Sequence, residues 1–366
     1  MFVSSYRRLT PCATATRKEP DMRVAIAAHI SGEADIDFVV QAERLGVDSV
    51  WVPEAWGFDA LTPLAFLAAR TTTIRLGTGI VQVGARTPAM LAMSAASLQS
   101  LSGGRFLLGL GTSGPQIMEG WHGVAFGSAV QAMRETMDIV RMATSGAKLE
   151  YHGEVYTVPR TGAKAIRSMT PPVTVPMYVA ALGPKNLELT GELADGWIGN
   201  AFIPERGHSF LDSLRVGASR SGRALDAIDL LMPVGVEFTD DFDEAARRHA
   251  SGYAFTIGAM GSKTQNFYNA AFTRQGFGDD VEAVQQLWLD GRRDEARARV
   301  PLEIGWGTNL LGTPAMITDR LRAYKRAGIT TLQAKLSGTV EARIDTLAQL
   351  MELVAEVDAE PHVVLA

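Results

Sequence analysis

Four short glycine-rich segments, each at the end of an apolar run, are the first candidates for ligand chemistry. They read LGTGI at 76–80, LGLGTSG at 108–114, AALGPK at 180–185 and GWIGN at 196–200. Because glycine has no side chain, the backbone at these points can approach a flat ligand closely. The third segment leads into a predicted helix that begins near Lys185, and the N–H groups of a helix N-terminus attract phosphate. Together the segments predict a planar cofactor with a phosphate tail.

The second segment also matches the GxGxxG spacing of a dinucleotide-binding loop, through Gly109, Gly111 and Gly114. In that fold the glycine loop follows the first strand and leads directly into a helix. Here Pro115 follows, the next clear helix is predicted near Ser128, and the segment comes after the fourth predicted strand. We therefore reject a dinucleotide-binding fold of this type.

Metal and Schiff-base chemistry have little support in the sequence. The histidines form no HxH pair, HExxH motif or Cys/His cluster, so a metal-dependent hydrolase would lack its ligands. Lys335, in the last predicted strand, would suit a Schiff-base aldolase if its side chain pointed into the mouth of a barrel. An ordinary lysine at a strand end is the simpler interpretation. The histidines are His29, His122, His152, His208, His249 and His362.

The glycine segments need a framework that brings their ends together, and the chain alternates short apolar or β-branched runs with longer helical patterns. Thr87-Pro88 and Thr313-Pro314 are typical helix starts. Eight strand-helix units, with no linker rich in Pro, Gly or Ser between halves, favour an α/β fold of the closed (β/α)8 TIM barrel type over two doubly wound domains. The predicted strands are 24–29, 48–53, 73–80, 105–111, 175–182, 196–200, 228–236 and 330–336.

A plain barrel needs about 250 residues, so the remaining length must form insertions. Residues 150–158 alternate around a turn at His152-Gly153 and predict a small hairpin before the fifth strand. The largest insertion, 238–311, lies between the seventh and eighth strands and includes the segment 258–272. Loops after the strands form the active face of a barrel, so this insertion is a candidate lid or substrate wall. A packing or dimer surface is an equally good interpretation.

The composition is that of a soluble globular protein, with 46% hydrophobic and 20% charged residues among 366. The 35 basic and 40 acidic residues leave a net charge of −5, which offers no electrostatic footprint for nucleic acid or an anionic membrane. No uninterrupted apolar run of about 18 residues predicts a membrane span. The single cysteine, Cys12, cannot form an internal disulfide, so we expect a cytoplasmic protein.

The two ends of the chain differ from the rest. Residues 1–21 contain four basic residues and no secretory apolar region, and they end in Pro20-Asp21 just before an apolar strand. We expect them to be a disordered extension, derived from an upstream start codon or a vector, with Met22 opening the folded part. The barrel is expected to run over 22–357, with a C-terminal tail at 358–366.

From 22 to 357 the sequence resembles the bacterial luciferase-like superfamily and, within it, the branch that uses coenzyme F420. The resemblance rests on LGTGIVQVGARTP, SGGRFLLGLGTSGPQIMEGWHGVAF, VPMYVAALGPKNLELTGELADGWIGN, GAMGSKTQNFYN and GTPAMITDRLRAYKRAGITTL, in this order. Their order and spacing are far more specific than a single glycine motif. The resemblance implies a TIM barrel that binds a deazaflavin.

The resemblance also implies positions around that cofactor. A cis peptide between Gly79 and Ile80 would press against the face of the deazaflavin ring. Thr112 and Ser113 would lie at the ring edge, although they also suit a cap of the following turn. The remaining cofactor positions are Ala181, Leu182 and Gly183 at the phosphate and Asn200 at the neighbouring strand end.

The sequence departs from the sugar-phosphate dehydrogenases of that family, which carry an Asp-His pair after the second strand and a Glu after the fourth. The matching positions here are Glu54-Ala55 and Gly114, so we do not expect oxidation of a sugar-phosphate alcohol. Candidate acid-base groups are Glu54, His29 and His122, and a structural role suits each histidine equally well. Burial would raise the pKa of Glu54, whereas a nearby arginine or backbone N–H would lower it. Candidate substrate-binding walls are Trp56 and Trp121.

The expected function is that of an F420-dependent oxidoreductase, which moves a hydride between the deazaflavin C5 and a small organic substrate while a side chain or water moves the proton. Two alternatives keep the fold. One is an FMN-dependent luciferase-like monooxygenase that uses oxygen, and the other is a non-catalytic flavin- or deazaflavin-binding barrel that acts as a carrier or sensor. The resemblance further implies a homodimer.

Overall fold

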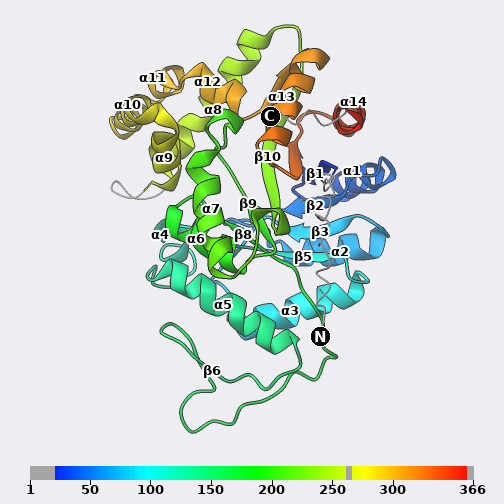
Figure 1. Cartoon of the computed structure of the whole chain (residues 1–366), viewed down its shortest axis with the longest axis vertical. Coiled ribbons are helices and arrows are strands. Elements are labelled where there is room, and N and C mark those ends of the chain that lie inside the picture. Colours follow the sequence, from blue (N-terminus) through cyan, green and yellow to red (C-terminus); the bar gives the residue numbers. More distant parts are fainter. Residues whose placement is uncertain (1–20, 261–265, 361–366) are drawn as a thin grey trace, which may run out of the picture.

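The chain forms a closed barrel of eight parallel strands (Figure 1). The computed structural model describes residues 21–260 and 266–360. The strands, in order around the barrel, are β1 (Arg23–Ala27), β2 (Ser49–Val52), β3 (Arg75–Thr78), β5 (Phe106–Gly111), β8 (Met177–Ala180), β9 (Gly196–Ile198), β10 (Asp229–Phe238) and β12 (Thr331–Lys335). β12 pairs with β1 and closes the ring. Every barrel strand lies where the sequence predicts one, so the TIM-barrel prediction is confirmed.

Helices on the outside of the barrel shield the strands from water. They are α1 (Glu33–Arg44), α2 (Leu61–Arg70), α3 (Pro88–Leu101), α5 (Ala129–Thr144), α6 (Pro184–Leu193), α7 (His208–Arg220), α13 (Pro314–Arg326) and α14 (Val340–Ala359). The Thr87 hydroxyl accepts a hydrogen bond from the N–H of Met90 and caps α3. Thr313 caps α13 in the same way through the N–H of Met316. Both predicted helix starts are confirmed, and both follow from the Thr-Pro sequence.

Short elements depart from the plain strand-helix pattern. β4 (Val81–Gln82) pairs with β5, and β11 (Leu310–Gly312) pairs with the far end of β10. α4 (Pro115–Met118) is a single turn in the loop after β5, and Pro115 suits its first position. The clear helix predicted near Ser128 is α5, which begins at Ala129. Two further turns are η1 (Pro204–Arg206) and η2 (Leu225–Ala227).

The predicted hairpin before the fifth barrel strand is present, but its turn differs. β6 (Tyr151–His152) pairs antiparallel with β7 (Thr157–Val158), so the turn spans 153–156 instead of lying at His152–Gly153. The reason lies in Glu135 of α5, which is fully buried. Its carboxylate accepts hydrogen bonds of 2.7 to 3.1 Å from three successive N–H groups of this turn and fixes its place.

The largest insertion lies between β10 and β12, as predicted, and forms a helical layer at the upper left of Figure 1. It consists of α8 (Phe242–Ala259), α9 (Phe267–Phe272), a π-helical turn (Thr273–Phe277), α10 (Gly278–Leu289), α11 (Arg293–Arg299) and α12 (Leu302–Gly307). The layer has its own apolar cluster, which includes Phe272, Val284 and Ile304. Of the predicted segment 258–272, residues 261–265 lie outside the described residues.

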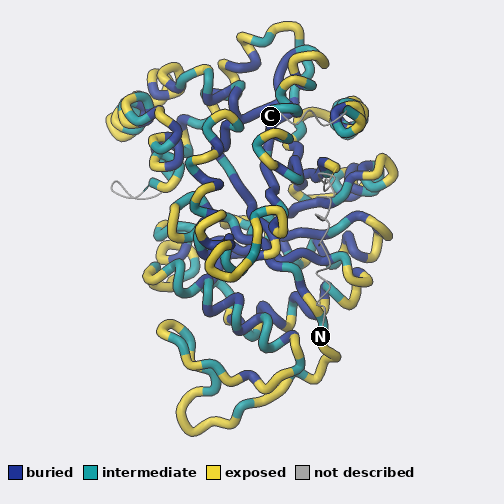
Figure 2. Tube along the Cα trace, viewed as in Figure 1, coloured by how far each residue is buried: buried dark blue, intermediate teal, exposed yellow. Residues whose placement is uncertain are grey.

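The interior of the barrel is filled by large side chains. Trp51 and Tyr178 are buried and meet edge to face, with ring centroids 4.9 Å apart. Gly77 and Gly196 make room for them, because a Cβ would lie 2.4 Å from the Trp51 ring or 2.1 Å from the Tyr178 ring. Figure 2 shows the buried strands at the centre and exposed residues on the outer helices. A filled interior leaves the strand ends as the place for a ligand.

The C-terminal helix ties the ends of the described chain together. α14 runs to Ala359, beyond the predicted boundary at 357. Asp358 accepts a hydrogen bond from the N–H of Met22 at 2.8 Å and pairs with Lys325 at 2.7 Å. Apart from Asp21 and 358–360, the predicted extension and tail lie outside the described residues. Within the described ranges, we find no helix with the length and apolar character needed to cross a membrane.

Candidate active site

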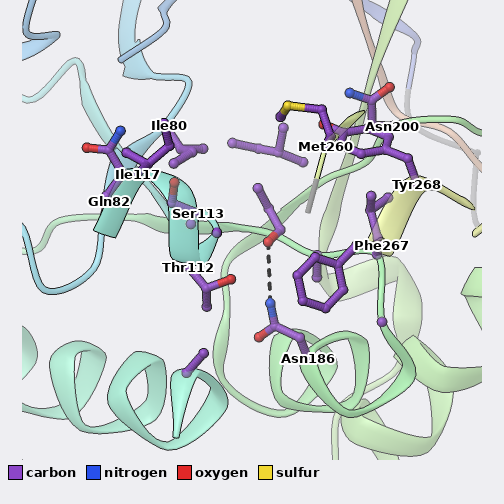
Figure 3. A pocket seen from close by; sticks show the side chains of 18 of the residues that line it. Ile80, Gln82, Thr112, Ser113, Ile117, Asn186, Asn200, Met260, Phe267 and Tyr268 are labelled. Carbon is purple, nitrogen blue, oxygen red and sulfur yellow. Dashed lines mark hydrogen bonds between the residues drawn. The ribbon is translucent and has the colours of Figure 1, made fainter. Parts of the chain in front are cut away.

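A cavity of about 940 Å³ lies at the carboxyl ends of the barrel strands (Figure 3). One wall consists of residues that follow β2, β3, β5, β8 and β9, and the other comes from α8 and α9. Ligands bind at this end of a TIM barrel. The predicted site residues that line the cavity are Glu54, Trp56, Ile80, Thr112, Ser113, Ala181, Leu182, Gly183 and Asn200.

The predicted cis peptide between Gly79 and Ile80 is present. Ile80 lines the cavity beside Gly111, where an added Cβ would lie only 2.5 Å from the Ile80 side chain. Glycine at 111 therefore allows Ile80 to hold this position. Ser113, two residues further on, has a φ of 56°, a left-handed conformation that residues other than glycine seldom adopt. Backbone held in such a conformation is typical of ligand-binding sites.

The N-terminus of α6 forms one end of the cavity. Gly183 is the residue before the helix, and Lys185 in its first turn also lines the cavity. Arg274, from the π-helical turn, donates a hydrogen bond to the carbonyl of Leu182. Helix N–H groups and the Lys185 ammonium at this end of the cavity suit a phosphate.

Two amide side chains of the cavity have acceptors that lack a partner within the described residues, Gln82 Oε1 and Asn186 Oδ1. Gln82 Nε2 donates to the carbonyls of Glu54 and Ala55 at 3.2 and 3.0 Å, which fixes the amide with its oxygen turned away from them. Asn186 Nδ2 donates to the carbonyl of Ala180 at 3.4 Å (Figure 3). Buried acceptors are normally satisfied, so this cavity suits a ligand that brings N–H or O–H donors.

Glu54 forms a paired ion bridge instead of a free carboxylate. Its two oxygens accept from Arg86 Nη1 and Nη2 at 2.7 and 2.8 Å, and Oε2 also accepts from the N–H of Ala60 at 3.0 Å. The Glu54 side chain is only 8% exposed. The hydrogen bonds that Arg86 donates to Glu54 raise the pKa of the guanidinium, so Arg86 stays charged. The arginine and N–H donor that the sequence left open are both present, and this geometry favours a positioning role for Glu54.

The other predicted acid-base and wall residues lie elsewhere. His29 follows β1 with an exposed side chain, and His122 lies in the loop after α4. Neither lines the cavity, although His122 Nε2 is buried without a hydrogen-bond partner within the described residues. Trp121 is 63% exposed and also stays outside, whereas Trp56 lines the cavity while 53% exposed. Lys335 ends β12 and does not line the cavity.

Sequence reasoning missed the residues that complete the cavity. Gln82 lies two positions after the cis peptide, and Asn186 directly follows the third glycine segment, so both could have been found by extending those motifs. The residues from the insertion are Phe255, Ala259, Met260, Phe267 and Tyr268. Phe267 and Tyr268 belong to the quoted segment GAMGSKTQNFYN, but no local pattern shows that this segment faces the barrel.

The chain is similar to known proteins over most of its length. A Mycobacterium tuberculosis protein, provisionally named a coenzyme F420-dependent oxidoreductase, is 34% identical over 318 residues, which cover 84% of this chain and 92% of that protein. The 5,10-methylenetetrahydromethanopterin reductase of Archaeoglobus fulgidus is 28% identical, over 81% of this chain and 87% of its own length. Among solved structures, the coenzyme F420-dependent tetrahydromethanopterin reductase of Methanopyrus kandleri has the same fold, with a TM-score of 0.74 at 22% identity, covering 92% of this chain and 99% of that one.

The family assignment follows from a match along most of the sequence. The model of the luciferase-like monooxygenase family matches residues 14–331. This range includes every barrel strand except the last four residues of β12, and all the residues that line the cavity. The chain therefore belongs to the luciferase-like monooxygenase family.

Proposed function

We propose that the protein is an F420-dependent oxidoreductase that transfers a hydride between the deazaflavin and an organic substrate. The observation that carries this proposal is the cavity at the strand ends, which brings Ile80 and Gly111 together with the N-terminus of α6 at Gly183. The relatives at 34% and 28% identity are named as an F420-dependent oxidoreductase and as a reductase of a methanopterin, respectively. When bound, F420 supplies a carbon that accepts or donates a hydride.

Each part of the barrel wall has a task in this proposal. Ile80 would support the face of the ring, and Thr112 and Ser113 would lie at its edge. The N–H groups at the start of α6, with Ala181, Leu182 and Gly183, would hold the phosphate. Gln82 Oε1 and Asn186 Oδ1 would accept hydrogen bonds from donors on the ligand, and Asn200 would contact it from the end of β9.

The ion pair of Glu54 and Arg86 would hold the wall in place. The carboxylate joins the loop after β2 to the segment after β4 and to Ala60, the residue before α2. A carboxylate with both oxygens bonded to arginine is a poor proton carrier, because protonation would break the pair. Glu54 therefore positions Gln82, whose amide bonds to the Glu54 and Ala55 carbonyls.

Binding of F420 and FMN to the purified protein, measured separately by titration calorimetry, tests the proposal. F420 should bind at least about tenfold more tightly, a difference of about 1.4 kcal/mol. The second candidate, an FMN-dependent monooxygenase, is kept because the family is named for that activity. It would bind FMN as tightly as F420 or more tightly, and the reduced FMN complex would consume oxygen with turnover. A binding barrel without activity would bind F420 but turn over no substrate.

We further propose a homodimer through α2 and α3. These helices pack against each other, and their outer faces expose Phe66, Met90, Met93 and Leu101 at 50 to 69%. α3 contains no charged residue, which is unusual for the outer helix of a barrel. A second copy of the same face would cover this surface under twofold symmetry. Sedimentation velocity should show a dimer that Met93→Glu converts to a monomer; a monomeric wild-type protein would refute it.

A cytoplasmic location and the absence of nucleic-acid and membrane partners remain predictions. They rest on the single cysteine, Cys12, which lies outside the described residues, and on the net charge of −5. The expected partner is a small organic substrate.

A further inference from the structure

The insertion between β10 and β12 supplies the wall of the cavity opposite Ile80, the residue proposed to support the cofactor ring. In Figure 3, Ile80 lies on one side, whereas Tyr268 lies on the other beside Asn200 and Met260. Only three titratable side chains line the cavity within the described residues: Glu54, Lys185 and Tyr268. Glu54 is bound to Arg86, and Lys185 lies at the helix end proposed for the phosphate. Tyr268 is therefore the remaining group from which a substrate could take a proton.

The surroundings of the Tyr268 hydroxyl keep its proton available. Burial raises the pKa of the phenol, and the nearby side chain of Asn200 lowers it only in part, so the hydroxyl stays protonated at neutral pH. Asn200 Oδ1 already accepts a hydrogen bond from the N–H of Ala201 at 2.8 Å. The amide NH2 of Asn200 can donate to the phenol oxygen, and in that arrangement the phenol O–H is free to donate into the cavity.

Tyr268 is held in place by a polar clamp between α8 and α9. Asn266 Oδ1 accepts hydrogen bonds from the N–H groups of Tyr268 and Asn269, both at 3.0 Å. Asn266 Nδ2 donates to the carbonyls of Thr256 and Ile257 at 3.1 and 2.6 Å. The same amide therefore caps α9 and binds it to the end of α8, which fixes the direction from which Tyr268 approaches the cavity.

The rest of this wall indicates the chemical class of the substrate. Phe255, Met260 and Phe267 present aromatic and thioether surfaces beside Tyr268. No charged side chain from the insertion lines the cavity within the described residues, and Glu54 is neutralised by Arg86. A charged substrate would lose its hydration against this wall without gaining a partner, whereas a neutral apolar molecule would gain by burial.

We propose that Tyr268 donates its phenolic proton to the carbonyl oxygen of a neutral ketone or aldehyde whose apolar body packs against Phe255, Met260 and Phe267. This inference rests on the proposed function, which supplies reduced F420 as the hydride donor. The carbonyl carbon gains the hydride, the C=O π pair moves to oxygen, and that oxygen takes the proton as the O–H bond of Tyr268 breaks. Water then returns a proton to the phenolate. In the reverse direction, Tyr268 accepts the proton of an alcohol.

A dead-end complex with oxidised F420 tests the contact without turnover. Acetophenone, 1-indanone and 2-tetralone, each labelled with 13C at the carbonyl, are titrated into the holoprotein and followed by 13C NMR. A bound ketone should give a carbonyl resonance in wild type that lies downfield of its position in Tyr268→Phe, because a donor polarises the C=O bond. Its Kd should rise by about 5- to 10-fold in Tyr268→Phe, as expected for one hydrogen bond.

Two further variants make the readout specific. Tyr151→Phe is the control, since Tyr151 lies in the β6–β7 hairpin, donates to Asp138 at 3.2 Å and does not line the cavity. It should leave the carbonyl resonance unchanged. Replacing Tyr268 with 3-fluorotyrosine keeps the shape and gives a stronger donor, so the resonance should move further downfield even if Tyr268→Phe folds poorly. With reduced F420, ketone turnover in Tyr268→Phe should fall by about 100-fold.

The outcomes separate the two proposals. A wild-type protein that does not bind F420 contradicts the proposed function itself. Tight F420 binding without binding of any of the three ketones overturns the substrate class. Ketone binding with the same carbonyl resonance in wild type, Tyr268→Phe and the fluorotyrosine protein overturns the role of Tyr268.

Discussion

The two ends of the barrel differ in whether their buried polar groups have hydrogen-bond partners within the chain. At the amino ends of the strands, Asp229 begins β10 and accepts hydrogen bonds from the hydroxyls of Thr330, Thr331 and Tyr178 at 2.5, 2.8 and 2.7 Å. Arg23 from β1 pairs with the same carboxylate at 2.7 Å. The chain itself satisfies this carboxylate with four donors.

At the carboxyl ends, several polar groups have no such partners. Gln82 Oε1 and Asn186 Oδ1 lack hydrogen bonds within the described residues, and Tyr268 lines the cavity beside Asn200. The contrast is clearest between two tyrosines. Tyr178 donates its hydroxyl hydrogen bond to Asp229, whereas the proposed acceptor of the Tyr268 hydroxyl is a substrate. Polar groups at the amino ends of the strands therefore stabilise the fold, whereas those at the carboxyl ends are available to bind a ligand.

The largest expected effect comes from Asp229→Asn. The carboxylate is 10% exposed, and an amide removes its charge beside Arg23 and puts an NH2 donor where Oδ2 accepts from Tyr178. We expect a loss of about 3 kcal/mol in the free energy of unfolding, measured by urea denaturation. The Kd for F420 should stay within about twofold of wild type, because this end does not touch the cavity. Unchanged stability, or a large loss of F420 affinity at full stability, would contradict the comparison.

The Glu54–Arg86 pair is an exception to this comparison. It lies at the carboxyl ends of the strands, and yet both of its charged groups have partners within the chain. Arg86→Met leaves a nearly buried carboxylate alone and should cost about 2 kcal/mol of stability while weakening F420 binding. Adding Glu54→Gln to it should restore part of the stability. The matched control is Arg70→Met, which removes an exposed pair with Glu33 and should leave the free energy of unfolding nearly unchanged. If Glu54→Gln alone abolished turnover while stability and F420 binding stayed normal, Glu54 would be the proton carrier and not a positioning residue.

Removing one hydroxyl from each tyrosine sharpens the comparison. Tyr178→Phe deletes a hydrogen bond to a charged group and should lower the free energy of unfolding by about 1.5 kcal/mol, with F420 affinity unchanged. Tyr268→Phe should leave the unfolding free energy within about 0.5 kcal/mol, because Tyr268 lines the cavity instead of bonding to a buried carboxylate. Thermal melts of the two variants beside wild type give the answer. A larger loss at Tyr268 than at Tyr178 would show that the two ends are not divided in this way.

The smallest effect concerns acid pH. Burial raises the pKa of Asp229, but Arg23 and the hydroxyls of Thr330, Tyr178 and Thr331 outweigh it and hold the pKa below the ordinary aspartate value. Because the folded pKa is the lower one, the stabilisation is complete above the ordinary value of about 3.9 and is lost as the pH falls through the folded pKa. The stability difference between wild type and Asp229→Asn should therefore shrink below about pH 4. A difference that grows on acidification would mean that the carboxyl is held neutral.

The barrel and its glycine wall could be predicted from the sequence because their signals are local. The Thr87-Pro88 pair caps α3 through residues that are neighbours in the sequence. The cis peptide between Gly79 and Ile80 was predicted from the family resemblance of the segment around it. The partner of Glu54 could not be predicted, since Arg86 reaches it from a different strand end. Tyr268 was missed for the same reason, because only the packing of the insertion brings it to Asn200.

His29, His122 and Trp121 show the converse. Their residue types suited catalysis or a substrate wall, but a loop position after a strand does not fix which way a side chain points. His29 and Trp121 are exposed, and His122 does not line the cavity. Residue type and place in the sequence therefore predicted the backbone of the site better than its side-chain chemistry.

Binding of F420 to a protein with a blocked cavity tests the central claim most directly. Gly183 lines the cavity with an ordinary φ of −79°, and an added Cβ would meet nothing within 4 Å, so Gly183→Phe can fold while filling the proposed phosphate end. Gly252→Phe is the control, because Gly252 is exposed on α8 and equally free of contacts. We predict that calorimetric titration gives a Kd for F420 about 100-fold higher in Gly183→Phe, at unchanged Tm, and a wild-type Kd in Gly252→Phe. Wild-type F420 affinity in a folded Gly183→Phe protein would contradict the account.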